Sequence, residues 1–218
     1  MPAATSPVHS RPTYWSRAKR ELARSDATMA RIIAAHPRVA LTSRGDPFTT
    51  LARSIVGQQI SVKAAEAVWG RFAACCGEMN PERVLRRRAT TLRACGLSDR
   101  KVEYIRDLAA HFVSGRVDPA HFAEQDDEQI IAELVDIRGI GRWTAEMFLI
   151  FNLLRPNVLP LDDLGLLKAV SLAYFDGAPM AGREQRAHIT ALAGPWEPWR
   201  SVATWYLWRS LDPVPVEY

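Results

Sequence analysis

Two glycines that lie between helical stretches have the spacing that points most directly to chemistry. Residues 134–145 read LVDIRGIGRWTA, with the glycines at positions 139 and 141. Such a turn leaves the first N–H groups of the following helix without partners inside that helix, and the helix dipole adds partial positive charge there. These donors suit a phosphate, and glycine lets a nucleic-acid backbone approach closely. The turn predicts either a phosphate contact or an ordinary glycine stop between two helices.

A pair of carboxylates is the second candidate for chemistry. Asp162 and Asp163 follow the proline-containing loop RPNVLPL (155–161) and open another helical pattern. Either side chain can cap that helix by accepting a backbone hydrogen bond. An ionised carboxylate at a helix N-terminus can also stabilise positive charge on a substrate or orient a water molecule. From the residues alone, the capping role is favoured over the catalytic one.

The elements that must position these residues are all helical. Alanine, leucine and arginine are frequent, and no long alternating run of β-branched residues occurs. We therefore expect an all-α fold of two helical lobes with a cleft. The expected helices cover 14–35, 47–57, 62–76, a short stretch after Pro81, 99–114, Asp126 or Asp127 to Val135, 143–154, Asp162-Asp163 through Val170, 183–192 and 198–211.

Composition narrows the class of protein. The 218 residues carry a net charge of +4, which permits a polyanionic partner without demonstrating one. Only Lys19, Lys63, Lys101 and Lys168 are lysines, so a mechanism with a lysine nucleophile has few candidates. No apolar run approaches the ~20 residues that span a bilayer, and the first residues lack the apolar core of a signal peptide. We expect a cytoplasmic protein, associated with the nucleoid in a bacterium.

Four motifs in order resemble the helix-hairpin-helix (HhH-GPD) superfamily of DNA glycosylases, and within it the DNA-3-methyladenine glycosylase II family. They are SIVGQQIS at 54–61, the hairpin at 134–145, LPLDDL at 159–164, and WEPWRS at 196–201 followed by WYLW at 205–208. The resemblance runs from about Phe48 to Leu211. It implies a helical glycosylase fold with a DNA-binding cleft and no separate N-terminal β domain. It also implies a monofunctional enzyme that excises alkylated purines of the 3-methyladenine type, leaving an abasic site, in base excision repair.

The resemblance assigns roles to individual residues. Asp163 matches the family's catalytic aspartate, and Asp162 takes a supporting position. The target base must leave the DNA stack to reach that carboxylate, and aromatic faces attract a cationic methylated purine. The implied base pocket consists of Trp143, Met147 and Trp208. The implied DNA contacts are Gly139, Gly141, Arg142 and Thr144 in the hairpin, with Gln58 or Gln59 filling the gap that the flipped base leaves.

The resemblance also limits the cofactors. Bifunctional relatives carry a lysine just after the hairpin that attacks the sugar as an amine, and this chain has Trp143 there. The three cysteines do not match the four-cysteine iron–sulfur cluster that such relatives often carry. No cofactor is therefore expected, except a structural Na⁺ or K⁺ at the hairpin. The implied ligands of that cation are the backbone carbonyls of Val135, Ile137 and Ile140.

We expect three segments along the chain. Residues 1–45 form an N-terminal helical segment that packs with the C-terminal lobe, 46–155 form the central lobe with the hairpin, and 156–218 carry the aspartate segment and the C-terminal helices. The expected partner is double-stranded DNA containing alkylated bases, bound by a monomer, with no membrane involved. Two alternatives stay open: a non-catalytic helix-hairpin-helix DNA-binding module, which needs no groove-facing acid, and a glycosylase for other damaged bases.

Overall fold

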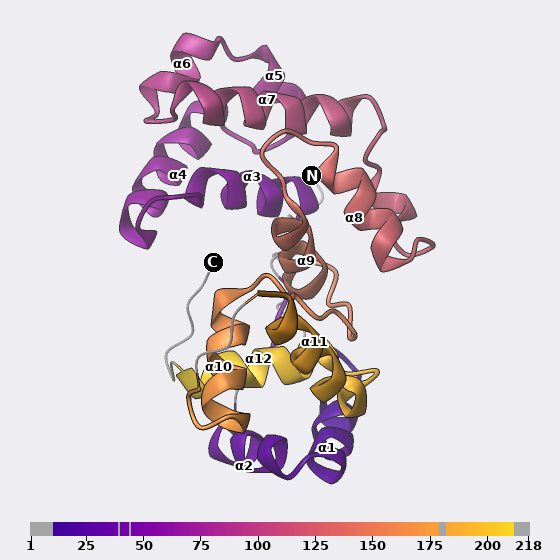
Figure 1. The fold of residues 1–218 in the computed structure, drawn as a ribbon. Helices are drawn as coiled ribbons and strands as arrows, with labels where there is room; N and C mark the ends of the chain where they lie inside the picture. The colour runs from indigo at the N-terminus through magenta and orange to yellow at the C-terminus, as the bar shows by residue number, and fades with distance from the viewer. Residues whose placement is uncertain (1–10, 39, 44, 179–181, 212–218) are drawn as a thin grey trace. The chain divides into compact units, whose positions relative to one another are not determined.

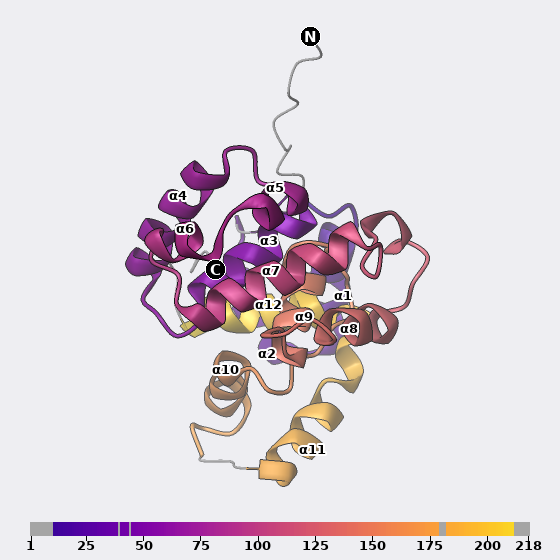
Figure 2. The same cartoon turned by 90° about the horizontal axis from the view of Figure 1, so that it is seen from above.

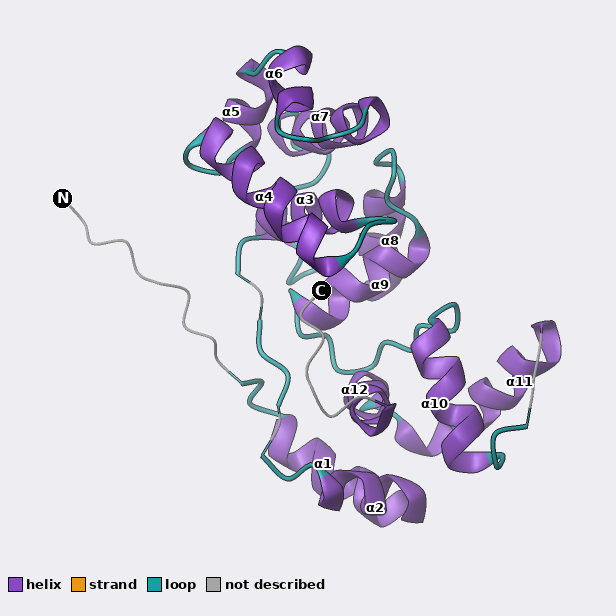
Figure 3. Ribbon diagram, turned by 90° about the vertical axis from the view of Figure 1, so that its left-hand side faces the viewer, coloured by secondary structure: helices purple, strands orange, loops and turns teal. Residues whose placement is uncertain are grey.

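The computed structural model describes residues 11–38, 40–43, 45–178 and 182–211, without the side chains of 182–184. Within these ranges the chain is helical and has no strand, which confirms the all-α prediction (Figure 3). No helix among the described residues is long and apolar enough to cross a membrane. Contacts divide the chain into two compact units. The first unit consists of Met1–Ser43 and Leu149–Glu217, and the second consists of Arg44–Phe148.

The first unit is built around its C-terminal helix. Its elements are α1 (Trp15–Ser25), α2 (Ala27–Ala35), α10 (Leu164–Tyr174), α11 (Gly182–Leu192), the short helix η2 (Gly194–Trp196) and α12 (Arg200–Leu211). Every residue from Ser201 to Leu207 is buried, and α12 packs against α1, α2 and α10. Figure 1 shows α10 beside α12. Because α12 is buried on all sides, it is the core element of this unit.

Asp26 divides what the sequence predicted as one helix over 14–35. The residue is extended, and its Oδ1 accepts hydrogen bonds from the N–H groups of Thr28 and Met29, so it ends the run of α1 and caps α2. Its Oδ2 accepts from the Tyr174 hydroxyl at 2.7 Å and the Trp196 indole N–H at 2.9 Å. One carboxylate therefore joins α2, α10 and η2 within the first unit.

The second unit surrounds α7 and contains the hairpin. Its elements are α3 (Pro47–Gly57), α4 (Val62–Cys76), α5 (Pro81–Arg86), α6 (Ala89–Ala94), α7 (Asp99–Val113), η1 (Pro119–His121), α8 (Asp127–Val135) and the start of α9 (Arg142–Phe151). Helix α7 packs against α3 and α5, and Figure 2 shows α3 beside it. The expected starts of α3, α4, α7 and α8 are confirmed, because the residue before each helix accepts a backbone hydrogen bond from its first turn: Asp46, Ser61, Ser98 and Asp126.

Candidate nucleic-acid interface and catalytic carboxylate

The glycine turn joins α8 to α9 within the second unit. Ile137 and Ile140 are buried and anchor it, with the Ile140 N–H donating to the Ile137 carbonyl at 3.1 Å. The Gly141 carbonyl accepts the first hydrogen bond of α9, from Ala145 at 3.0 Å. The geometry of a helix start gives the earlier N–H groups, among them that of Thr144, no partner inside the helix. The turn between two helices is thus as predicted, while its contact with an anion stays a prediction.

Only glycine fits at position 139. Its φ of +85° lies in the left-handed region, and a Cβ there would lie 2.2 Å from Cδ2 of Tyr104. Gly141 differs, because a Cβ at that position meets no atom within 4 Å. The two glycines therefore have different roles in the free protein. Gly139 is required by the packing of Tyr104, whereas Gly141 leaves open space at the start of α9.

The structure brings Gln58 to the hairpin. The Gln58 side-chain amide donates to the Gly139 carbonyl at 2.8 Å. Its neighbour Gln59 is exposed and has a φ of +59°, which is uncommon for a residue other than glycine. Gln58 is thus held against the turn, while Gln59 stands exposed at the end of α3. A hollow at this place is lined by Gln58, Gln59, Ser98, Arg100, Lys101, Tyr104 and Gly139.

Helix α7 supports both loops from within the unit. The Lys101 ammonium donates to the Val56 carbonyl at 2.7 Å, in the last turn of α3, and burial lowers the pKa of this lysine. Three residues further along α7, Tyr104 packs against Gly139. One face of α7 therefore fixes the end of α3 and the glycine turn together.

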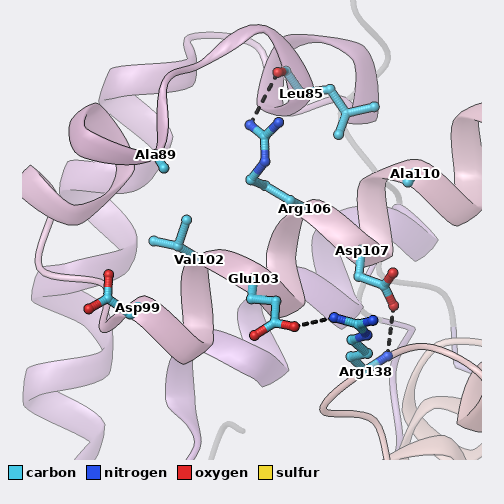
Figure 4. Close-up of a pocket in the computed structure, with 9 residues that line it drawn as sticks. All are labelled: Leu85, Ala89, Asp99, Val102, Glu103, Arg106, Asp107, Ala110 and Arg138. Carbon is cyan, nitrogen blue, oxygen red and sulfur yellow. Dashed lines mark hydrogen bonds and ion pairs between the residues drawn. The ribbon is translucent and has the colours of Figure 1, made fainter.

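Carboxylates of the same unit hold the two arginines beside the turn. Figure 4 shows the Arg138 guanidinium paired with Glu103. The backbone N–H of Arg138 donates to Asp107 Oδ2 at 2.8 Å. Arg142 pairs with Glu128, where one oxygen lies 2.9 Å from Nη1, and with Glu146 at 3.1 Å. The hydrogen bond to Glu128 raises the pKa of Arg142 above its usual value. The positive charge of Arg142, a predicted DNA contact, is therefore balanced by two carboxylates in the free protein.

The remaining hairpin predictions concern backbone and buried groups. Thr144 is only 6% exposed, so this residue lies largely inside the unit. Among the proposed cation ligands, the Ile137 carbonyl already accepts the Ile140 N–H, which leaves it one further lone pair. No group of three His, Cys, Asp or Glu side chains suited to a metal occurs among the described residues. The cation at the hairpin stays a prediction.

Asp163, in the first unit, both caps a helix and lies in a specific hydrogen-bonded setting. Its Oδ1 accepts the Leu166 N–H at 2.6 Å, which caps α10, and the Trp208 indole N–H at 2.8 Å. The side chain is nearly buried, with 9% exposure. The indole of Trp208 stacks on Phe151 with centroids 5.7 Å apart and an interplanar angle of 13°. The neighbouring Asp162 is exposed and pairs with Arg186.

Helix α12 also fixes the loop that precedes Asp163. The Ser201 N–H donates to the Pro156 carbonyl at 3.0 Å, and the Ser201 hydroxyl oxygen accepts the Val158 N–H at 2.9 Å. Ser201 lies seven residues, or about two turns, before Trp208 on the same helix. One helix therefore sets both the path of the loop and the indole that contacts the carboxylate.

Trp143 and Met147 lie one turn apart on α9, in the second unit. Trp143 is 37% exposed, although the rest of its helix is largely buried, and Met147 is partly buried. The spacing of four places both side chains on one face of α9. Their assignment to a base pocket stays a prediction.

The residues that hold the predicted site residues and their loops in place were not predicted from the sequence. Tyr104, Lys101 and Ser201 act through contacts between elements distant in sequence, for which the sequence carries no local signal. Gly165 had a signal, because a glycine inside an apolar helical pattern is unfavourable and indicates a close approach. A Cβ at Gly165 would lie 3.0 Å from Asp163 Oδ1.

The match to a known protein family includes both the hairpin and Asp163. Residues 52–191 match the family described as HhH-GPD superfamily base excision DNA repair protein. DNA-3-methyladenine glycosylase 1 of Schizosaccharomyces pombe is 33% identical over 169 residues, which cover 76% of this chain and 72% of that protein. A DNA-3-methyladenine glycosidase from Bacillus halodurans superposes with a TM-score of 0.80 at 35% identity, covering 89% of this chain and 88% of that chain. The S. pombe 3-methyladenine DNA glycosylase Mag1, solved in complex with abasic DNA, gives a TM-score of 0.74 at 29% identity, covering 93% and 98%. The chain belongs to the HhH-GPD superfamily of base excision DNA repair proteins.

Proposed function

We propose that this protein is a monofunctional DNA glycosylase of the DNA-3-methyladenine glycosylase II type. It flips alkylated purines out of double-stranded DNA, hydrolyses the N-glycosidic bond and leaves an abasic site. The observation that carries the proposal is the Asp163 carboxylate, nearly buried and held by the Leu166 and Trp208 donors in a chain of this family. A DNA-binding module needs the glycine turn but has no use for such an acid.

The proposed chemistry follows from charge. Breaking the bond between C1′ and the base nitrogen builds positive charge on the sugar, and the ionised Asp163 stabilises that charge. The bonding electrons leave with the base, and because an N3-alkylated adenine is cationic, it departs neutral without a protein acid. Water then adds to C1′ and gives its proton to Asp163 or to solvent. The products are the free base and an abasic site.

The proposed DNA contacts rest on the hairpin. The backbone N–H groups of Gly139, Gly141 and Thr144 contact phosphate, which positions the duplex without reading its sequence. Arg142 reaches phosphate only by exchanging Glu128 for it, because the two are paired in the free protein. If Na⁺ or K⁺ occupies the carbonyls of the turn, the ion adds positive charge beside that phosphate.

The proposed gap filler is Gln59. The amide of Gln58 is committed to the Gly139 carbonyl, whereas Gln59 is exposed beside it, so Gln59 has the freedom to enter the duplex. An amide there can hydrogen-bond the orphaned base. Trp143, Met147 and Trp208 remain the proposed contacts of the flipped base, because aromatic faces and a polarisable thioether suit a cationic purine.

Release of methylated bases tests this function. The protein is incubated with DNA carrying labelled methyl groups, and the released bases are separated by chromatography, with undamaged DNA and duplexes containing 8-oxoguanine or uracil as controls. We expect 3-methyladenine among the products. Release of only the oxidised or deaminated base would support the other-lesion alternative, and DNA binding without any release would support the non-catalytic module.

Borohydride treatment tests the monofunctional part separately. The position of the lysine nucleophile of bifunctional relatives is Trp143 here, so no imine should form on abasic DNA. A covalent protein–DNA adduct after reduction would contradict base release without amine chemistry.

A further inference from the structure

The first turn of α10 contains a glycine, Gly165, although the backbone conformation there is open to any residue. The φ of Gly165 lies outside the left-handed region, and glycine is less favourable than alanine inside a helix. Its surroundings explain it. A Cβ at this position would lie 3.0 Å from Asp163 Oδ1 and 3.2 Å from both Cδ1 and Nε1 of Trp208. The side chain is therefore missing at the place where the indole edge meets the carboxylate.

The neighbours of this place have little room to move away. Trp208 is stacked on Phe151, and its helix is buried along most of its length. Asp163 Oδ1 is tied to the Leu166 N–H at 2.6 Å, within the same turn as Gly165. A Cβ at 3.0–3.2 Å is tighter than ordinary contact, so the indole edge or the carboxylate would have to shift by a few tenths of an ångström.

We propose that Gly165 is a positioning residue: its missing side chain lets the Trp208 indole N–H reach Asp163 and fixes the direction in which this carboxylate points. The indole N–H at the edge of the Trp208 ring then orients the carboxylate, and this role is separate from any contact that the face of the same ring makes with a base. The proposal rests on the proposed function for its catalytic consequence, but the hydrogen bond it describes exists independently of activity.

The indole N–H signal of Trp208 tests the positioning directly. In a ¹⁵N-labelled sample its resonance is identified by its loss in Trp208→Phe. Hydrogen bonding to a carboxylate moves an indole proton downfield, so we expect an upfield shift in Asp163→Ala and a similar one in Gly165→Ala. The matched control is Gly70→Ala, a helical glycine in the other unit whose Cβ would meet nothing within 4 Å, and it should leave the resonance in place.

Single-turnover base release tests the catalytic consequence. A shift of a few tenths of an ångström at the carboxylate should lower the rate of Gly165→Ala by about tenfold, with the Kd for DNA unchanged. The fold should persist, because alanine is the better helix former. Trp208→Phe keeps the stacking ring but removes the donor, and we expect a loss of similar size.

The double variant Gly165→Ala/Trp208→Phe separates positioning from a general structural defect. If both changes act through the same hydrogen bond, the double variant should be no slower than the slower single variant. Multiplied losses, or a Gly165→Ala protein with the wild-type resonance and rate, would overturn the proposal. If the wild type releases no base, the proposed function fails, while the indole resonance still decides whether Gly165 positions Asp163.

Discussion

Replacing each glycine of the hairpin by alanine should separate folding from DNA binding. At Gly139 the substitution forces a left-handed φ of +85° on alanine, which costs about 1–2 kcal/mol. It also places a Cβ 2.2 Å from Tyr104 Cδ2, and such overpacking adds about 1–3 kcal/mol. We therefore expect Gly139→Ala to lower the free energy of unfolding by about 2–5 kcal/mol.

Gly141→Ala is the matched control with the opposite pattern. Its Cβ meets nothing within 4 Å and its φ is not left-handed, so the cost of losing glycine before α9 is about 1 kcal/mol or less. In the proposed complex, however, that Cβ enters the space between the first N–H groups of α9 and the phosphate. Losing one charge-assisted hydrogen bond costs about 1.5–3 kcal/mol, so DNA affinity should fall about tenfold or more.

Two measurements check this pair of predictions. Urea denaturation followed by tryptophan fluorescence gives the free energy of unfolding, and anisotropy of a labelled duplex at fixed salt gives the Kd. In a Tyr104→Ala background the overpacking is removed, so Gly139→Ala should then cost only about 1–2 kcal/mol. Equal stabilities of Gly139→Ala and wild type, or unchanged DNA binding by Gly141→Ala, would refute the reasoning.

The remaining predictions concern two carboxylates. Burial alone would raise the pKa of Asp26, but hydrogen bonds from Trp196, Met29, Tyr174 and Thr28 outweigh it and hold the pKa below its usual value. The stability this contributes is present above the unfolded pKa of about 3.9 and is lost as the pH falls through the lower folded value. The unfolding free energy of Asp26→Asn should therefore depend less on pH below about pH 5 than that of the wild type, and an unchanged pH profile would contradict this. Glu128→Gln should leave Arg142 paired with Glu146 alone, which makes its charge more available to phosphate. We expect tighter non-specific DNA binding and a salt dependence steeper by up to about one unit of log–log slope, whereas identical salt titrations would count against it.

Local features could be predicted from the sequence because they depend on residues three or four apart. The caps at Asp46, Ser61, Ser98 and Asp126 are of this kind, since each side chain reaches only to its own first turn. The break at Asp26 was missed, because the apolar pattern continues across it. A single extended residue there is stabilised by Tyr174 and Trp196, which are distant in sequence.

The supporting contacts of the candidate site could not be predicted in the same way. The bond from Trp208 to Asp163 joins residues 45 positions apart, and that from Gln58 to Gly139 joins residues 81 apart. Composition and spacing carry no information about such pairs. The sequence likewise gives no sign of the pairing between Arg142 and Glu128, and the predicted contact of Arg142 with DNA stays a prediction. For Asp163, the two predicted roles are compatible: the capping bond to Leu166 is present, and the catalytic role stays a proposal.

The most direct test of the central claim is single-turnover base release by Asp163→Asn at saturating enzyme. Asparagine can still accept the bonds from Leu166 and Trp208, so the cap and the fold should be retained while the negative charge is lost. We predict that release of 3-methyladenine falls by about 100-fold or more and that the Kd for the same duplex is unchanged. Release within a few-fold of the wild-type rate would contradict the claim that the Asp163 carboxylate carries the chemistry.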